Sequence, residues 1–372
     1  MRYWSIVLHF YQPPTQEEGI TRQILNSCYL PLLRLLAQRS GFGLTLNLSG
    51  SLLSQLKQLE ATEFFDLVKN LIIGKKIEIV NSVVYHPIIP LTPVDVVERQ
   101  ITKNQQILQD LLGVGSTSGF FPPELAVDTD SLNLINSHYI IVDQTALEIK
   151  TPIVKFGQKY LLVNNRPVCD LLRSYPRELK DSVVVDLVQN NCPDGGLLVS
   201  GNDAELFGHH YVERLGVLAD LLDVKDIKFI TASQAISQFG QKALTTDTIL
   251  SSTWQDCQNF ALWDKNDLQQ QYLNLLKTGY DLVRKNVDTE NQDYLDQAYS
   301  SCYPYWLSNW PWWHPGLVEK GVGNILKSAK GDKTVDTAAQ HFLDIMWKFH
   351  HSGEVEKNYQ RYNQTPDKFL RI

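Results

Sequence analysis

Two carboxylates and two imidazoles lie within ten residues of one another, in the segment Gly201-Asn-Asp-Ala-Glu-Leu-Phe-Gly-His-His210. This segment directly follows an apolar run, Gly196-Leu-Leu-Val-Ser200, which is typical of a buried strand. Parallel barrels and sheets keep their active sites at the carboxyl ends of such strands. Asp203 and Glu205 are therefore candidates for proton transfer. An ordinary helix start is an equally good interpretation of this run alone, because acidic residues favour the first helical turn.

A third carboxylate, Glu124, ends a short apolar run closed by two prolines, Gly119-Phe-Phe-Pro-Pro-Glu124. Proline fixes the backbone, so the direction of the glutamate side chain is restricted, as a nucleophile requires. The alternative is an exposed loop carboxylate, the usual situation of glutamate. Paired carboxylates carry out glycoside hydrolysis, in which one acts as nucleophile or base and the other donates a proton.

Polar side chains also stand at the ends of two earlier apolar runs. The first run, residues 4–9, stops at His9-Phe-Tyr-Gln-Pro13, and the second, residues 77–82, leads into His86-Pro87. If these strands are all parallel, their ends open onto one face of the fold. That face would collect His9, Tyr11, Gln12, Glu78, His86, Glu124, Asp203 and Glu205.

A metal ion could instead bind at this face, because histidine, aspartate and glutamate side chains are all expected there. The sequence contains no His-x-x-x-His pair and no paired-aspartate motif, and the adjacent side chains of His209 and His210 point apart. Carboxylate chemistry without a metal or another cofactor is therefore the favoured hypothesis.

The densest aromatic run is Tyr303-Pro-Tyr-Trp-Leu-Ser-Asn-Trp-Pro-Trp-Trp-His314. Aromatic rings can stack on the flat apolar faces of sugars, although core packing is the competing use for them. Two prolines and the polar residues Ser308 and Asn309 argue against a plain buried helix. The run is interpreted as one wall of a sugar-binding groove.

Strand-like and amphipathic runs alternate over the first 240 residues, which predicts a parallel α/β architecture, closed or nearly closed, with seven or eight strands. Past a Thr/Ser-rich connector, residues 245–253, the pattern becomes helical, and no strong strand run follows Thr231. The predicted strands are 4–9, 43–48, 77–82, 139–143, 159–163, 183–188, 196–200 and 227–231. The predicted late helices are 266–285, 290–299, 316–329 and 336–351.

Composition limits the class of partner. The 372 residues carry a net charge of −7 without a dense Lys/Arg run, which argues against nucleic acid or an anionic membrane. No stretch approaches the roughly 20 apolar residues of a membrane span, and the N-terminus lacks the features of a signal peptide. Five scattered cysteines suggest neither disulfides nor a zinc site. A cytoplasmic protein with a small neutral substrate, such as a sugar, is expected, and its oligomeric state is left open.

Five short regions, in this order along the chain, resemble the regions that mark glycoside hydrolase family 57. The third and fourth, which carry the two catalytic carboxylates of the family, are the most specific. The matching segments are His9-Phe-Tyr-Gln-Pro13, Glu78 through His86-Pro87, Gly119-Phe-Phe-Pro-Pro-Glu124, Asp203-Ala-Glu-Leu-Phe-Gly-His209 and Ser308-Asn-Trp-Pro-Trp-Trp313.

The resemblance implies an incomplete (β/α)7 barrel, residues 1–244, followed by a C-terminal helical bundle, residues 245–372, whose segment 303–314 lines the site. It implies retaining cleavage or transfer of α-glucosidic bonds by double displacement without a metal, with Glu124 as nucleophile and Asp203 as acid/base. The substrate would be an α-glucan or malto-oligosaccharide. The implied substrate-binding residues are His9, Tyr11, Gln12, Glu78, His86, Phe121, Glu205, Phe207, His209, Asn309, Trp310, Trp312 and Trp313.

Three positions depart from the family pattern. Tyr11 replaces a histidine, Phe121 a tryptophan and Asn309 an aspartate. Both catalytic carboxylates are present, so a glycosidase or 4-α-glucanotransferase activity is expected. The alternatives are a barrel that binds α-glucan without cleaving it and a metal-dependent enzyme of the deacetylase or mannosidase type.

Overall fold

The computed structural model describes residues 1–173, 179–285 and 288–363. Within these ranges, seven parallel strands close into a barrel. Phe120 pairs with Asn81 at one seam, and Asn165 N donates to Val199 O over 2.8 Å at the other. The strands, in order around the barrel, are β1 (Arg2–Phe10), β2 (Leu44–Leu48), β3 (Ile77–Val80), β4 (Gly119–Phe120), β5 (Tyr139–Asp143), β7 (Lys159–Asn164) and β8 (Leu197–Asp203).

Three further strands are attached to this barrel. β9 (Ile227–Phe229) enters between the amino ends of β1 and β2, since it pairs with β1 and its Phe229 O accepts from Gly43 N over 3.0 Å. β6 (Ile153–Phe156) runs antiparallel to β7, and β10 (Leu244–Thr246) pairs with β6. The expectation of no strand beyond Thr231 is therefore wrong for β10, whose three residues are too few to produce a clear alternation.

The strand predicted at 183–188 is also wrong, because this segment belongs to helix α8 (Asp181–Asn191). Its run of valines favours a strand by propensity alone. In the fold, however, Val184 and Val188 are buried four residues apart, while Val183 is 47% exposed. Helical burial on one face therefore overrides the local preference.

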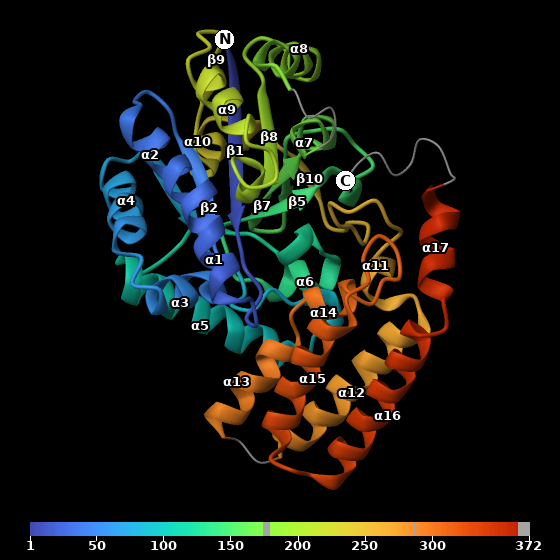
Figure 1. Ribbon diagram of the computed structural model, residues 1–372. Helices are drawn as coiled ribbons and strands as arrows, with labels where there is room; N and C mark the ends of the chain where they lie inside the picture. The colour runs from blue at the N-terminus through green and yellow to red at the C-terminus, as the bar shows by residue number, and fades with distance from the viewer. Residues whose placement is uncertain (174–178, 286–287, 364–372) are drawn as a thin grey trace.

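Helices cover the outside of the barrel and complete the α/β pattern (Figure 1). The helix expected over 51–71 is divided in two, because Glu60 takes a left-handed φ of 54°. The remaining bounds are α1 (Glu18–Ile24), α2 (Leu30–Gln38), α3 (Gly50–Gln58), α4 (Thr62–Ile73), α5 (Val94–Leu112), α6 (Thr129–Leu134), α7 (Arg166–Arg173), α9 (Arg214–Leu222) and α10 (Ala232–Phe239).

A helical bundle lies across the carboxyl ends of the strands, opposite the N-terminus (Figure 1). Its helices pack around a core that includes Tyr272, Ile325 and Phe342. Arg99 of α5 donates two hydrogen bonds, 2.6 and 3.0 Å long, to the buried carboxylate of Asp296 and so joins the bundle to the barrel. The bounds are α11 (Ala261–Asp264), α12 (Asp267–Val283), α13 (Thr289–Ala298), α14 (Cys302–Tyr305), α15 (Pro315–Ala329), α16 (Lys333–His350) and α17 (Glu354–Asn363).

The late helices thus confirm the helical pattern predicted from the sequence. Among the described residues, no helix has both the length and the apolar character needed to cross a bilayer.

Gly119 is expected to tolerate no side chain. A Cβ there would lie 2.1 Å from Cζ of Tyr139, and overpacking of this kind costs about 1–3 kcal/mol. Gly119→Ala should therefore lower the midpoint of urea unfolding. The matched control is Gly216→Ala on α9, where no atom lies within 4 Å and alanine should stabilise by about 0.5–1 kcal/mol. A Gly119→Ala variant as stable as the parent protein would contradict this packing.

Candidate active site

The register of two neighbouring strands places Asp203 directly beside His9. In the parallel β1–β8 pair, Val7 is opposite Gly201 and His9 is opposite Asp203. Val7 belongs to the core inside the barrel, and side chains two apart on a strand share a face, so His9 and Asp203 both project inward at the carboxyl end. The bundle covers this end of the barrel, so the site lies between the two parts of the fold (Figure 1).

Glu124 follows β4 on a short turn that presents its carboxylate to the same interior. Its φ of 57° is in the left-handed region, which non-glycine residues adopt mainly at functional or tightly determined positions. Oε2 accepts hydrogen bonds from Trp254 Nε1 over 2.7 Å and from Gln255 Nε2 over 3.0 Å. The backbone oxygen of Glu124 accepts from Trp254 N and from the Thr253 hydroxyl. Both the main chain and the carboxylate of Glu124 are thus fixed by one segment.

The two carboxylates have different electrostatic environments, and the charge of Glu124 acts on Asp203. Burial raises the pKa of Glu124, and its hydrogen bonds from Gln255 and Trp254 and the charge of Arg173 oppose that rise. Burial and then the nearby charge of Glu124 raise the pKa of Asp203 to about 7, against the pull of Arg173. Glu124 therefore receives two donors that favour its charged form, whereas Asp203 has no such donor among the described residues and holds a proton near neutral pH.

Glu205 is buried behind this pair. Its Oε1 accepts from Gln12 Nε2 over 3.0 Å and from the Tyr29 hydroxyl. Burial, followed by the charge of Asp203, raises the pKa of Glu205. Glu205 and Gln12 are therefore close to Asp203, as the sequence predicts, and Tyr29 is a partner that the sequence did not reveal.

Five aromatic rings pack against one another at the barrel mouth next to the carboxylates. The His9 ring stacks on Phe121 and on His86, each at a centroid distance of 4.8 Å, and His86 stacks on Tyr11 at 4.1 Å. Trp254 meets both His9 and Phe121 edge-on. Phe121 is fully buried beneath His9, so it supports the histidine and is not itself exposed to a ligand, contrary to the role expected for it.

The two imidazoles each have one buried nitrogen without a partner among the described residues. His9 Nδ1 lies 2.6 Å from Asn47 Oδ1, which places the proton on Nδ1 and makes Nε2 an acceptor. His86 Nδ1 contacts Ser301 Oγ at 2.9 Å, and its Nε2 is likewise unpaired. Burial lowers the pKa of His9 to about 4 and lowers that of His86 well below its usual value. Both rings are neutral near pH 7 and suited to hydrogen bonding.

The bundle side of the mouth holds two of these rings in place. The Tyr11 hydroxyl lies 2.8 Å from Ser300 Oγ, and Ser301 N donates to the backbone oxygen of His86. His86 itself has a left-handed φ of 62°. Tyr11 and His86 are therefore oriented by residues 289 and 215 positions later in the chain.

The aromatic run divides between the bundle and the mouth. Trp313 packs on Phe349 and donates from Nε1 to His350, and Trp310 meets Tyr359 edge-on. Trp312, by contrast, is 41% exposed, with its ring centroid 6.4 Å from that of Tyr305. Burial and the charge of Glu124 raise the pKa of the Tyr305 hydroxyl, which places this ring near the carboxylates.

Asn309 precedes these tryptophans in a left-handed conformation, φ 64°, and its buried Oδ1 has no partner in the part of the chain that the structure describes. Of the aromatic run, Trp312 is thus the ring presented to solvent, and Trp310 and Trp313 are used mainly in packing.

Glu78 is not part of this mouth, which corrects the sequence-based expectation. It is level with Val7, because Thr45 pairs with both residues, whereas His9 is level with Val80. Its carboxylate accepts from the Tyr139 hydroxyl over 2.7 Å and from Ser233 N over 2.9 Å. Glu78 therefore lies one layer of side chains closer to the amino end of the barrel and has a structural network of its own.

Phe207 and His209 also differ from expectation. Phe207 is 1% exposed and belongs to the core between barrel and outer helices, so it does not line the mouth. His209 lies on the loop after β8, where its ring packs against His210 at 5.1 Å, and burial lowers its pKa. No contact joins either side chain to the two carboxylates in the described structure.

Across the described residues, no group of three or more His, Cys, Asp or Glu side chains is placed to hold a metal ion.

Residues 6–185 match the family model described as glycosyl hydrolase family 57. The chain therefore carries a glycosyl hydrolase family 57 domain. No curated protein matches the chain.

Solved structures support the family 57 fold. The 4-α-glucanotransferase of Thermococcus litoralis aligns with a TM-score of 0.74 at 16% identity, over 89% of this chain and 60% of that one. The branching enzyme of Pyrococcus horikoshii aligns with a TM-score of 0.71 at 13% identity, over 92% and 94% of the two chains. The α-amylase AmyC of Thermotoga maritima aligns with a TM-score of 0.63 at 15% identity, over 97% of this chain and 95% of that one.

At these identities the likeness concerns the fold, an α/β barrel followed by C-terminal helices. The chain spans about 60% of the length of the Thermococcus protein.

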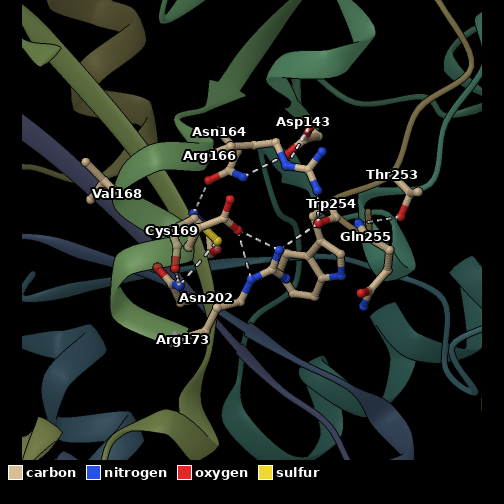
Figure 2. Close-up of polar contacts among 12 residues, drawn as sticks. Asp143, Asn164, Arg166, Val168, Cys169, Arg173, Asn202, Thr253, Trp254 and Gln255 are labelled. Carbon is tan, nitrogen blue, oxygen red and sulfur yellow. Dashed lines mark hydrogen bonds and ion pairs between the residues drawn. The ribbon is translucent and has the colours of Figure 1, made fainter. Parts of the chain in front are cut away.

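Several residues of this candidate site carried no clear signal in the sequence. Trp254 and Gln255 follow a Thr/Ser-rich stretch that looked like a connector. Arg166 and Arg173 lie on α7, directly beyond β7, where the polar run Asn164-Asn-Arg166 ends an apolar strand. Figure 2 shows both guanidinium groups directed at Trp254. The available hints were this polar strand end and a large aromatic residue, Trp254, isolated in an otherwise polar segment.

Proposed function

We propose that this protein is a retaining enzyme that hydrolyses or transfers α-glucosyl units of malto-oligosaccharides. The observation that carries the proposal is the unequal environment of the two carboxylates. Glu124 accepts two side-chain hydrogen bonds that stabilise its charge, whereas the pKa of Asp203 is raised by burial and by the charge of Glu124. One ionised and one protonated carboxyl is the starting state for double displacement.

In the first step, a Glu124 oxygen attacks the anomeric carbon while the glycosidic bond breaks and Asp203 gives its proton to the leaving oxygen. Both hydrogen bonds to the Glu124 carboxylate fall on Oε2, so we assign the attack to Oε1. In the second step, the Asp203 carboxylate takes a proton from water or from a sugar hydroxyl. The oxygen thus activated attacks the anomeric carbon and releases Glu124.

The rings and the bundle would hold the sugar in this geometry. The unpaired Nε2 atoms of His9 and His86 offer hydrogen bonds to hydroxyls, and Tyr11 is fixed beside them by Ser300. An unmade hydrogen bond of a buried polar atom costs about 1–3 kcal/mol, which a bound hydroxyl would recover. In this proposal residues 1–244 form the catalytic barrel and residues 245–372 a helical domain that lines it.

Incubation with maltoheptaose tests the proposal and separates its alternatives. Shorter and longer products together indicate transfer, and shorter products alone indicate hydrolysis. Binding by calorimetry without any product would favour a glucan-binding barrel that does not cleave. Loss of activity in a chelator, restored by a divalent metal, would favour a metal-dependent enzyme. The absence of both products and binding would overturn the proposal.

Trp312 should contribute to affinity for the glucan chain. A stacked pair of aromatic rings is worth about 0.5–1.5 kcal/mol. If stacking of a ring on a sugar face is of the same size, Trp312→Ala should weaken maltoheptaose binding about threefold to tenfold. The change in kcat should be small, because the ring does not touch the reacting atoms. Trp347→Ala is the matched control, since that tryptophan lies on α16 and donates to Glu319. Equal loss of affinity in both variants would contradict a specific role for Trp312.

A further inference from the structure

Two arginines converge on a single main-chain oxygen next to the site. Arg166 Nη2 donates to the carbonyl oxygen of Trp254 over 2.7 Å, and Arg173 Nη2 donates to the same oxygen over 2.8 Å. Figure 2 shows the two guanidinium groups approaching this carbonyl from two different directions. A carbonyl has two lone pairs, so this oxygen is fully occupied by charge-assisted hydrogen bonds.

Each arginine is itself anchored. Arg173 donates from Nε and Nη2 to Asp170 Oδ1, over 3.2 and 2.8 Å. Arg166 Nε lies 3.8 Å from Asp143, a carboxylate with no exposed surface. Both arginines belong to α7, seven residues apart, which places them on the same side of the helix. The pair therefore has fixed positions, and its two anchoring carboxylates balance its charge.

The residue held in this way is the one that holds Glu124. Trp254 donates from its backbone nitrogen to the backbone oxygen of Glu124 over 3.1 Å and from Nε1 to Oε2 over 2.7 Å. The main chain of Trp254 is therefore held at its nitrogen by Glu124 and at its carbonyl oxygen by the two arginines. Neither guanidinium makes a direct hydrogen bond to the Glu124 carboxylate among the described residues, so their geometric effect on it passes through Trp254.

We propose that Arg166 and Arg173 are positioning residues that orient the Glu124 carboxylate by clamping the Trp254 carbonyl. The catalytic consequence rests on the proposed function, because it takes Glu124 as the nucleophile. The structural part, a clamp that sets the Trp254–Glu124 hydrogen bond, stands independently. A displacement of about 1 Å at a reacting group can cost about 10²-fold in rate, so a clamp without any substrate contact can control kcat.

Arg173 can also act on the site through its charge, and a test of the clamp must distinguish this effect from the geometric one. Its charge also lowers the pKa of both Glu124 and Asp203. In the described structure, the charged or titratable groups near it also include Asp170 and Cys169 on its own helix. If Arg173 acts by charge alone, its removal should lower kcat by the same factor whether or not the Trp254 indole is present.

A double-mutant cycle distinguishes the two routes. Arg173→Met and Trp254→Phe are each expected to lower kcat for maltoheptaose by about 10- to 100-fold, with KM within about threefold. If the clamp acts through the indole, the double variant should be about as slow as Trp254→Phe alone. If kcat of the double variant is instead lowered by the product of the two single losses, the proposal is overturned. An unchanged kcat in a folded Arg173→Met variant would also overturn it.

A spectroscopic measurement tests the clamp even if the protein has no activity on α-glucans. The indole N–H resonance of Trp254, assigned by its absence from the Trp254→Phe spectrum, should report the hydrogen bond to Glu124. It should move towards the position of a free indole in Arg173→Met and also in Arg166→Met. The second variant keeps the test decisive if the first does not fold. An unmoved resonance in a folded variant refutes the clamp, whereas a moved resonance without glucan cleavage by the parent protein refutes only the proposed function.

Discussion

Glu124→Gln is expected to abolish turnover of malto-oligosaccharides, with kcat lowered by about 10⁴- to 10⁶-fold. The amide cannot form the glycosyl ester, and loss of a nucleophile in other enzymes has an effect of this size. Glutamine is nearly isosteric with glutamate and can still accept from Trp254 and Gln255 through its carbonyl oxygen. The fold should therefore be unchanged, and calorimetry should still detect binding of maltoheptaose. Product formation over a long incubation measures the residual rate.

Glu78→Gln is the matched control for this change. Glu78 is also a glutamate inside the barrel with side-chain and main-chain donors, but it lies one layer towards the amino end. The variant should keep kcat within a few fold of the parent protein. If Glu78→Gln lost activity as completely as Glu124→Gln, the assignment of the nucleophile would have to be withdrawn.

Asp203→Asn should remove the proton donor to the leaving oxygen. The kcat for maltoheptaose should fall by about 10²- to 10⁴-fold, as expected for loss of a general acid/base. An aryl α-glucoside whose phenol departs without a proton should still glycosylate the enzyme, and added azide should restore turnover. In the parent protein, kcat/KM should fall as pH rises above about 7, where Asp203 loses its proton. This alkaline limb should be absent from the variant, and its persistence would contradict the assignment.

The same shift predicts a pH dependence of stability. Folding raises the pKa of Asp203 from 3.8 to about 7, so the folded state binds the proton more tightly than the unfolded state. The stabilising effect of the protonated carboxyl is complete below pH 3.8 and is lost as pH rises towards 7. Each pKa unit corresponds to about 1.4 kcal/mol. Asp203→Asn should therefore raise the midpoint of thermal unfolding, relative to the parent protein, more at pH 8 than at pH 4.

The sequence predicts which polar residues lie at the carboxyl end of a strand only where a buried strand runs directly into them. Asp203 is such a case, because β8 continues to that residue and its register with His9 follows from parallel pairing. Glu78 was misplaced because it is the second residue of β3 and not its last. The polar residue that belongs to the carboxyl end, His86, comes only after an irregular loop whose path local patterns do not specify.

The contacts that orient the site could not be predicted, because they join segments far apart in the chain. Trp254 reaches Glu124 across 130 residues, and Ser300 reaches Tyr11 across 289. Neither contact leaves a periodic pattern, since each depends on how an irregular segment crosses the barrel mouth. The aromatic run was noticed, yet which ring would be exposed depended on the packing of α16 and α17, so Trp312 could not be told from Trp310 and Trp313.

The order in which the chain is synthesised gives the Trp254–Glu124 contact a further meaning. A nascent chain that has emerged to residue 244 already contains both catalytic candidates and every strand of the closed barrel. It still lacks the indole that holds Glu124 and the serines that hold Tyr11 and His86. Domains tend to fold from the N-terminus during synthesis, so the barrel can assemble before its chemistry is in place. Catalytic competence would then arise as a late event in biogenesis, when the last third of the polypeptide docks.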